Sequence, residues 1–139
     1  MKEFGASVAR ETTGRPLGKN AKVIALIGDL GAGKTTFAQG FLKELRVKRR
    51  VISPTFLIIR PYKVKAGRYA TAYHIDCYRL NNLTELLSLG FKELIGDPKN
   101  IVLIEWPELI KKYLPRDTRW ISIEHPEKGT HRTVFYSSL

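Results

Sequence analysis

The chain has 139 residues, 43% of them hydrophobic, and its 24 Lys and Arg against 13 Asp and Glu give a net charge of +11. This length indicates a single domain, residues 1–139, and the composition is sufficient for a hydrophobic core. The absence of a long apolar run, of an apolar N-terminal segment and of a second cysteine excludes a membrane helix, a signal peptide and a disulfide, so we expect a cytoplasmic protein.

The first part of the chain predicts a helix, a loop, a strand and a second helix. Residues 2–11 carry a weak helical pattern, and the glycine- and proline-containing residues 12–20 indicate a loop. The continuous apolar run 22–27 predicts a strand that is buried on both faces. A glycine-rich segment follows at once, and apolar side chains then recur at helical spacing over residues 34–45.

The second part predicts more strands, separated by short helices. Residues 55–64 and 68–76 are rich in β-branched and aromatic side chains, and the glycine between them indicates a hairpin. Leucines in residues 83–90 predict a short amphipathic helix that ends near Gly90. The remaining expected elements are a buried strand at 101–104, a helix that begins at Pro107, and a pair of strands at 120–124 and 132–136.

Residues 28–35 read GDLGAGKT, which matches the P-loop pattern G-x-x-x-x-G-K-[ST]. The glycines allow backbone conformations that a Cβ forbids, so successive N–H groups and the start of the next helix surround a phosphate. Lys34 is placed to reach the β- and γ-phosphates, and the hydroxyl of Thr35 is placed to bind Mg²⁺. The alternative is a glycine-rich turn with a lysine by chance, which the context of buried strand and helix disfavours.

Two carboxylates follow predicted strands, where a P-loop protein holds its metal and orients water. Glu105 ends the run 101–104, and Asp76 ends the run 68–76, although each could instead cap a helix or pair with a surface base. Ser53 and Thr55 lie where P-loop switches sense the γ-phosphate, or form an ordinary turn into a strand. We interpret the neighbouring His74, Cys77 and Trp106 as packing side chains in the first instance.

Five segments together resemble the bacterial TsaE (YjeE) family of P-loop ATPases. They occur in the family's order and spacing, and the resemblance extends from Val23 through nearly the whole remaining chain. The segments are 28–37 (GDLGAGKTTF), 53–56 (SPTF), 73–80 (YHIDCYRL), 89–91 (LGF) and 104–108 (IEWPE).

The resemblance implies an ATPase that is required for threonylcarbamoyladenosine next to the anticodon of tRNA. Its partners would be TsaD, which transfers the threonylcarbamoyl group, and TsaB, and ATP hydrolysis would support turnover of their complex. Contact with tRNA would be indirect, through that complex. The fold would be α/β, a three-layer P-loop NTPase fold with a mixed, partly antiparallel sheet.

The resemblance also implies a role for each site residue, with ATP and Mg²⁺ as cofactors. Phosphate would be held by Gly31, Ala32, Gly33, Lys34, Thr35 and Thr36. Thr35 and Glu105 would bind Mg²⁺, Asp76 would be the catalytic or water-positioning acid, and Trp106 would lie near the nucleotide. Ser53 and Thr55 would belong to a switch-like loop.

The sequence differs from the family pattern at three places. The family begins with another strand and a threonine-containing turn that helps contact base and ribose, whereas this chain begins at the predicted helix. Residues 46–50 are more basic than the family pattern and lack its glycine after the helix, and Cys77 replaces a leucine. These differences leave the phosphate end of the expected ligand better accounted for than its base.

Other functions remain open from the residues alone. A small P-loop kinase would need an acceptor pocket and an arginine-rich lid, and a nucleotide-dependent assembly or tRNA-binding module would turn over negligibly. A regulatory GTPase is disfavoured because the N-K-x-D motif is missing. The positive charge favours RNA or an acidic protein surface as partner, or serves solubility alone. Arg79 and Arg132 are candidates for an arginine finger within the chain.

Overall fold

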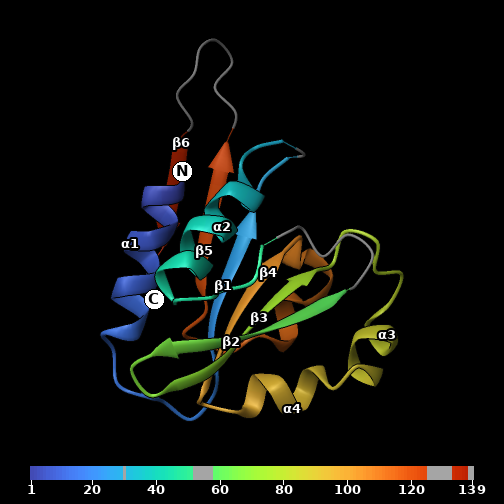
Figure 1. Cartoon of the computed structure of the whole chain (residues 1–139). Helices are drawn as coiled ribbons and strands as arrows, with labels where there is room; N and C mark the ends of the chain where they lie inside the picture. Colours follow the sequence, from blue (N-terminus) through green and yellow to red (C-terminus); the bar gives the residue numbers. More distant parts are fainter. Residues whose placement is uncertain (30, 52–57, 125–132, 138–139) are drawn as a thin grey trace.

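The computed structural model describes residues 1–29, 31–51, 58–124 and 133–137. Helices and strands follow one another in the order that the sequence indicates (Figure 1). The elements are α1 (Lys2–Thr13), β1 (Lys22–Ile27), α2 (Lys34–Glu44), β2 (Ile59–Ala66), β3 (Tyr69–Asp76), α3 (Leu83–Ser88), α4 (Phe91–Gly96), β4 (Asn100–Glu105), the 3₁₀ helix η1 (Pro107–Tyr113), β5 (Arg119–Glu124) and β6 (Thr133–Ser137). No helix within these ranges is both long and apolar enough to cross a membrane.

The strands form one mixed sheet in the order β2-β3-β4-β1-β5-β6. The four inner strands β3, β4, β1 and β5 run parallel to one another, and the outer strands β2 and β6 run antiparallel to them. The sheet confirms the expected α/β fold. Strand β3 runs parallel to β4, and strand β5 runs parallel to β1. Residues 77–99 form the long crossover that the parallel β3–β4 pair requires.

Helices cover both faces of the sheet and make three layers. Along β1, Ile24 and Leu26 pack in one hydrophobic cluster with α1 and α2, whereas Val23 packs in a second cluster with α3, α4 and η1. The same alternation along β4 places Leu103 in the first cluster and Ile104 in the second. The uninterrupted apolar runs of these strands therefore follow from burial on both faces.

Helices α1 and α2 lie side by side (Figure 1) and approach closely through two glycines. A Cβ at Gly5 would lie 2.2 Å from the carbonyl oxygen of Phe37, and a Cβ at Gly40 would lie 2.1 Å from that of Lys2. The ring of Phe4 packs on Phe37, with 5.6 Å between the ring centroids. This contact fixes the helix that begins directly after the P-loop.

The helix expected in residues 83–90 is α3, and it ends before Gly90 as expected. Gly90 adopts a left-handed conformation (φ 84°) and begins a second helix, α4, which the sequence pattern does not predict. The segment after Pro107 is a 3₁₀ helix, η1. Strand β2 begins at Ile59, and the expected start of that strand at 55–57 lies outside the described residues.

Candidate functional site

The P-loop occupies the connection between β1 and α2. Gly31 and Gly33 have φ angles of 76° and 110°, which are left-handed values that side chains with a Cβ rarely adopt. Helix α2 begins at Lys34, and its first N–H groups, including those of Thr35 and Thr36, have no acceptor within the helix. These half-buried threonines and the buried Ala32 stand at the positive end of the helix dipole, where an anion is favoured.

Gly28 is required where the loop passes the neighbouring strand β5. A Cβ at Gly28 would lie 2.5 Å from the carbonyl oxygen of Ile123, a backbone atom that cannot move aside. The first glycine of the motif therefore sets the path of the loop over the sheet. The two later glycines set the direction of its N–H groups.

Lys34 is buried, with 5% of the residue exposed, and its ammonium lies within this loop. It donates hydrogen bonds to the carbonyl oxygens of Gly28 and Asp29, the latter at 2.9 Å, and stands 4.0 Å from the ring centroid of Trp106. Burial lowers the pKa of Lys34, and the carboxylates of Glu105 and Asp76 oppose this shift. The ammonium is therefore close enough to both acids to form one electrostatic unit with them.

Asp76 and Glu105 lie next to one another at the carboxyl ends of β3 and β4. They are register partners, and Leu26 of β1 is the register partner of Glu105 on the other side. Strand β4 thus lies directly beside the strand that leads into the P-loop. The structure brings both predicted acids to the same edge of the sheet as Lys34, as the strand-end positions indicate.

The two carboxylates have different surroundings. Asp76 is half-buried, and its Oδ1 accepts a hydrogen bond of 2.9 Å from the N–H of Tyr78. Burial raises the pKa of Asp76, the Tyr78 N–H opposes this effect, and the charge of Glu105 adds to it. Glu105 is 3% exposed, and its Oε2 lies 2.7 Å from Nε2 of His74.

His74, which the sequence pattern indicates as a packing side chain in the first instance, lies in the site. Its side chain is completely buried, and Nδ1 has no hydrogen-bond partner among the described residues. A histidine partner orients a carboxylate and limits its rotation, so the contact with His74 fixes the orientation of the Glu105 carboxylate. The alternation of a strand would have revealed it, because residues 74 and 76 lie on the same face of β3.

Trp106 has a strained backbone beside the site. Its φ and ψ of 56° and 57° are left-handed, which costs a residue other than glycine about 1–2 kcal/mol. The ring packs against Tyr78, with 5.0 Å between the centroids, and faces the ammonium of Lys34. Strain of this kind clusters at ligand sites, and it directs the indole toward the P-loop here.

The remaining predicted residues are only partly placed. Arg79 is exposed in the turn after β3, whereas Ser53, Thr55 and Arg132 lie outside the described residues. Cys77 is buried, and burial raises the pKa of its thiol to about 12, as expected for a core residue. Within the described ranges, no three His, Cys, Asp or Glu side chains gather as a ready metal cluster.

The donor set nevertheless fits magnesium. Mg²⁺ prefers oxygen ligands, and proteins hold it through one or two side chains while phosphate and water complete the shell. Thr35 at the start of α2, which follows β1, and Glu105 at the end of β4, which pairs with β1, supply a hydroxyl and a carboxylate.

A buried lysine in a glycine-rich loop between a central parallel strand and a helix, with acids at the ends of the adjacent strands, defines a P-loop NTPase fold. Residues 1–134 match the family described as threonylcarbamoyl adenosine biosynthesis protein TsaE. The chain therefore belongs to the TsaE family.

Individual relatives agree with this assignment. A protein of Bacillus subtilis (strain 168), named tRNA threonylcarbamoyladenosine biosynthesis protein TsaE, is 41% identical over 117 residues, which is 84% of this chain and 70% of that protein. The protein of the same name from Borreliella burgdorferi is 34% identical and matches 86% of this chain and 81% of its own length. The chain spans about half the length, 52%, of a relative from Rickettsia felis that is 42% identical.

A solved structure also matches the fold. The crystal structure of Bacillus subtilis YdiB aligns with a TM-score of 0.65 at 32% identity, over 99% of this chain and 80% of that one. The likeness extends beyond the P-loop to the whole sheet and its helices.

Proposed function

We propose that this protein is a Mg²⁺-dependent ATPase that supports the threonylcarbamoyladenosine modification of tRNA together with TsaD and TsaB. The observation that carries the proposal is the buried Lys34 ammonium in the P-loop, beside the paired strand ends of Asp76 and Glu105. The relatives are named for threonylcarbamoyladenosine biosynthesis, which supports the role in tRNA modification. The geometry of the P-loop and the two acids supports ATP hydrolysis. We expect the protein to act in the cytoplasm.

The P-loop residues would bind the phosphates of ATP. The N–H groups from Gly31 to Thr36 form the cradle, and phosphate oxygens would replace the carbonyl oxygens of Gly28 and Asp29 as acceptors for Lys34. Lys34 would then stabilise the negative charge that develops on the γ-phosphoryl group as water attacks in line. The indole of Trp106 would lie at the edge of this cradle.

The two acids would have different roles in the reaction. Thr35 and the His74-oriented Glu105 would hold Mg²⁺, which neutralises phosphate charge when bound. Asp76 would orient the attacking water and accept its proton, because a pKa raised by burial makes a carboxylate a better base. Switch-like roles for Ser53 and Thr55 and an arginine finger from Arg79 or Arg132 are further parts of the proposal.

The experiment is a measurement of inorganic phosphate released from MgATP by the protein alone, with TsaD and TsaB, and with small-molecule acceptors. We expect slow release alone, stimulation of about tenfold or more by the partners, and no dependence on an acceptor. ADP formation that requires an acceptor would instead identify a small kinase. Tight MgATP binding without phosphate release, even with both partners present, would identify an assembly module.

A further inference from the structure

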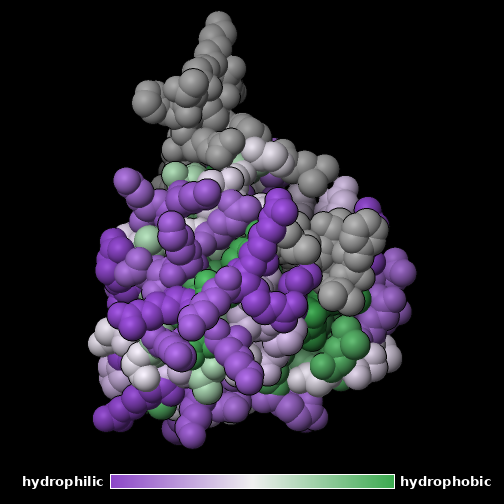
Figure 2. Space-filling view, in the orientation of Figure 1, coloured by the Kyte–Doolittle hydropathy of each residue, from purple (hydrophilic) through white to green (hydrophobic). Residues whose placement is uncertain are grey.

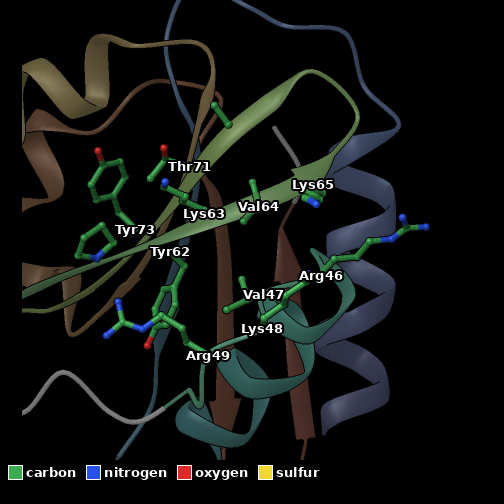
Figure 3. Close-up of a pocket in the computed structure, with 12 residues that line it drawn as sticks. Arg46, Val47, Lys48, Arg49, Tyr62, Lys63, Val64, Lys65, Thr71 and Tyr73 are labelled. Carbon is green, nitrogen blue, oxygen red and sulfur yellow. The ribbon is translucent and has the colours of Figure 1, made fainter.

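A basic groove lies at the sheet edge that β2 forms, away from the P-loop (Figure 3). Its volume is about 1010 Å³, and its walls come from the segment after α2 and from the β2–β3 hairpin. The charged members of its lining are Arg46, Lys48, Arg49, Lys63 and Lys65, and we call the space between them the basic groove.

The lining of the basic groove contains five cations and no carboxylate. None of the five forms an ion pair with an acid in the described part of the chain. Figure 2 shows hydrophilic side chains over this face, where α2 and β2 lie. Unneutralised charge of one sign along a groove concentrates the field there and attracts a polyanion.

The cations lie on both sides of the edge strand β2 (Figure 3). Lys63 and Lys65 belong to β2, and Lys63 lies on the side of Thr71 and Tyr73. Arg46, Lys48 and Arg49 follow the end of α2, and Lys48 and Arg49 lie on the side of Tyr62. A hydrogen bond of 3.3 Å from the N–H of Lys65 to the carbonyl oxygen of Leu45 joins the segment after α2 to β2. The groove is therefore part of the folded structure.

One tyrosine near the cations is partly accessible. Tyr62 is 2% exposed and packs in the core cluster with α1 and α2, so its ring is not available to a ligand. Tyr73 of β3 lies on the other face of the sheet and is half-buried. Cationic surfaces that carry an accessible aromatic ring bind nucleic-acid strands without reading their sequence.

A different explanation accounts for only part of this surface. Lysines on an edge strand prevent pairing with other strands, and Lys63 and Lys65 serve that purpose on β2. It does not explain the three cations in the segment after α2, which belong to no strand.

We propose that the basic groove binds RNA directly, through its phosphodiester backbone. RNA is favoured over an acidic protein because the five cations extend around the edge strand with no carboxylate in the lining, which suits a continuous chain of phosphates, and because the half-buried ring of Tyr73 can stack on a base. This contact is additional to the proposed ATPase function, which by itself involves tRNA only through partner proteins.

The test compares two triple variants that each lower the net charge from +11 to +8 by removing three cations. The groove variant carries Lys48→Gln, Arg49→Gln and Lys63→Gln. The control variant carries Lys19→Gln, Lys112→Gln and Arg116→Gln, which are exposed and lie outside the groove lining. Binding of fluorescently labelled tRNA is followed by anisotropy between about 50 and 200 mM salt.

The groove variant should bind tRNA about tenfold or more weakly, and the slope of log affinity against log salt should fall by about 2. The control variant should remain within about twofold of the parent. Equal weakening in both variants would show that net charge alone is responsible, and no weakening in the groove variant would refute the proposal. Groove-dependent binding of poly-glutamate as tight as that of tRNA would assign the groove to an acidic protein instead.

A nucleotide measurement separates this proposal from the ATPase proposal. The lining of the groove includes no residue of the described part of the P-loop, so the groove variant should keep the parent's MgATP affinity. Lost tRNA binding with intact MgATP binding supports the groove alone. Lost binding of both, with a lower thermal stability, would show that the segment after α2 has only a structural role.

Discussion

The side chains at the edge of the sheet form a connected set. His74 contacts Glu105, Glu105 lies beside Asp76, and both acids act on the Lys34 ammonium, whose other face meets Trp106. Each of these groups is at least half-buried, so their charges interact more strongly than they would at the surface. Substitution of one member should therefore change the electrostatics of the others.

Asp76 provides a test of this environment through stability. Because folding raises its pKa, the ionised carboxylate destabilises the fold, and this cost appears as pH rises above its ordinary pKa near 4. We expect Asp76→Asn to raise Tm by about 2 °C at neutral pH and to have little effect at about pH 4, measured by circular dichroism. The same variant should lose ATP hydrolysis.

The matched control is Asp97→Asn. Oδ1 of Asp97 accepts the N–H of Lys99 at 2.9 Å, as Oδ1 of Asp76 accepts that of Tyr78, but Asp97 is exposed. This control should show no gain at neutral pH. An equal gain in both variants, or a gain that does not grow with pH, would contradict burial as the cause.

At the scale of elements, the close contact between α1 and α2 fixes the position of the helix that begins in the P-loop. The two glycines at this contact leave no space for a methyl group, and the helix that they hold presents its N-terminus to the phosphates. Burial of the apolar faces of both helices thus determines where the cradle lies relative to β1.

Gly40→Ala tests this contact. Alanine favours a helix by about 1 kcal/mol over glycine, but the added Cβ would lie 2.1 Å from the carbonyl oxygen of Lys2. We therefore expect the free energy of unfolding in urea to fall by about 2 kcal/mol. Gly96→Ala, whose Cβ meets no atom within 4 Å, should be neutral or stabilising. Equal effects in both variants would show that the close contact is unimportant.

Much of this arrangement follows from the sequence. The P-loop glycines and Lys34 can be predicted because they match a local motif between a strand and a helix. The two acids can be predicted because each follows an apolar strand pattern. The direction of β3 and the bond between His74 and Glu105 depend on which strands pair, which local pattern does not determine. Likewise the sequence shows that residues 46–50 are basic, but only the fold brings them opposite β2.

At the scale of the whole molecule, α2 connects the two sites. The P-loop includes its first two residues, Lys34 and Thr35, and the basic groove begins two residues after its last, Glu44, so roughly 16 Å of helix connects them. The excess of positive charge is thus present at two places with different ligands. Phosphate in the P-loop is held by backbone N–H groups and one buried lysine, whereas the groove offers exposed cations to a longer anion.

The most direct test of the central claim is phosphate release from MgATP in the presence of TsaD and TsaB. The parent is compared with Lys34→Ala and Glu105→Ala, after circular dichroism shows that each variant is folded. We predict that each variant loses about 100-fold or more in rate, because each removes a charge that acts in the transition state. Undiminished hydrolysis in both variants would contradict the assignment of this site.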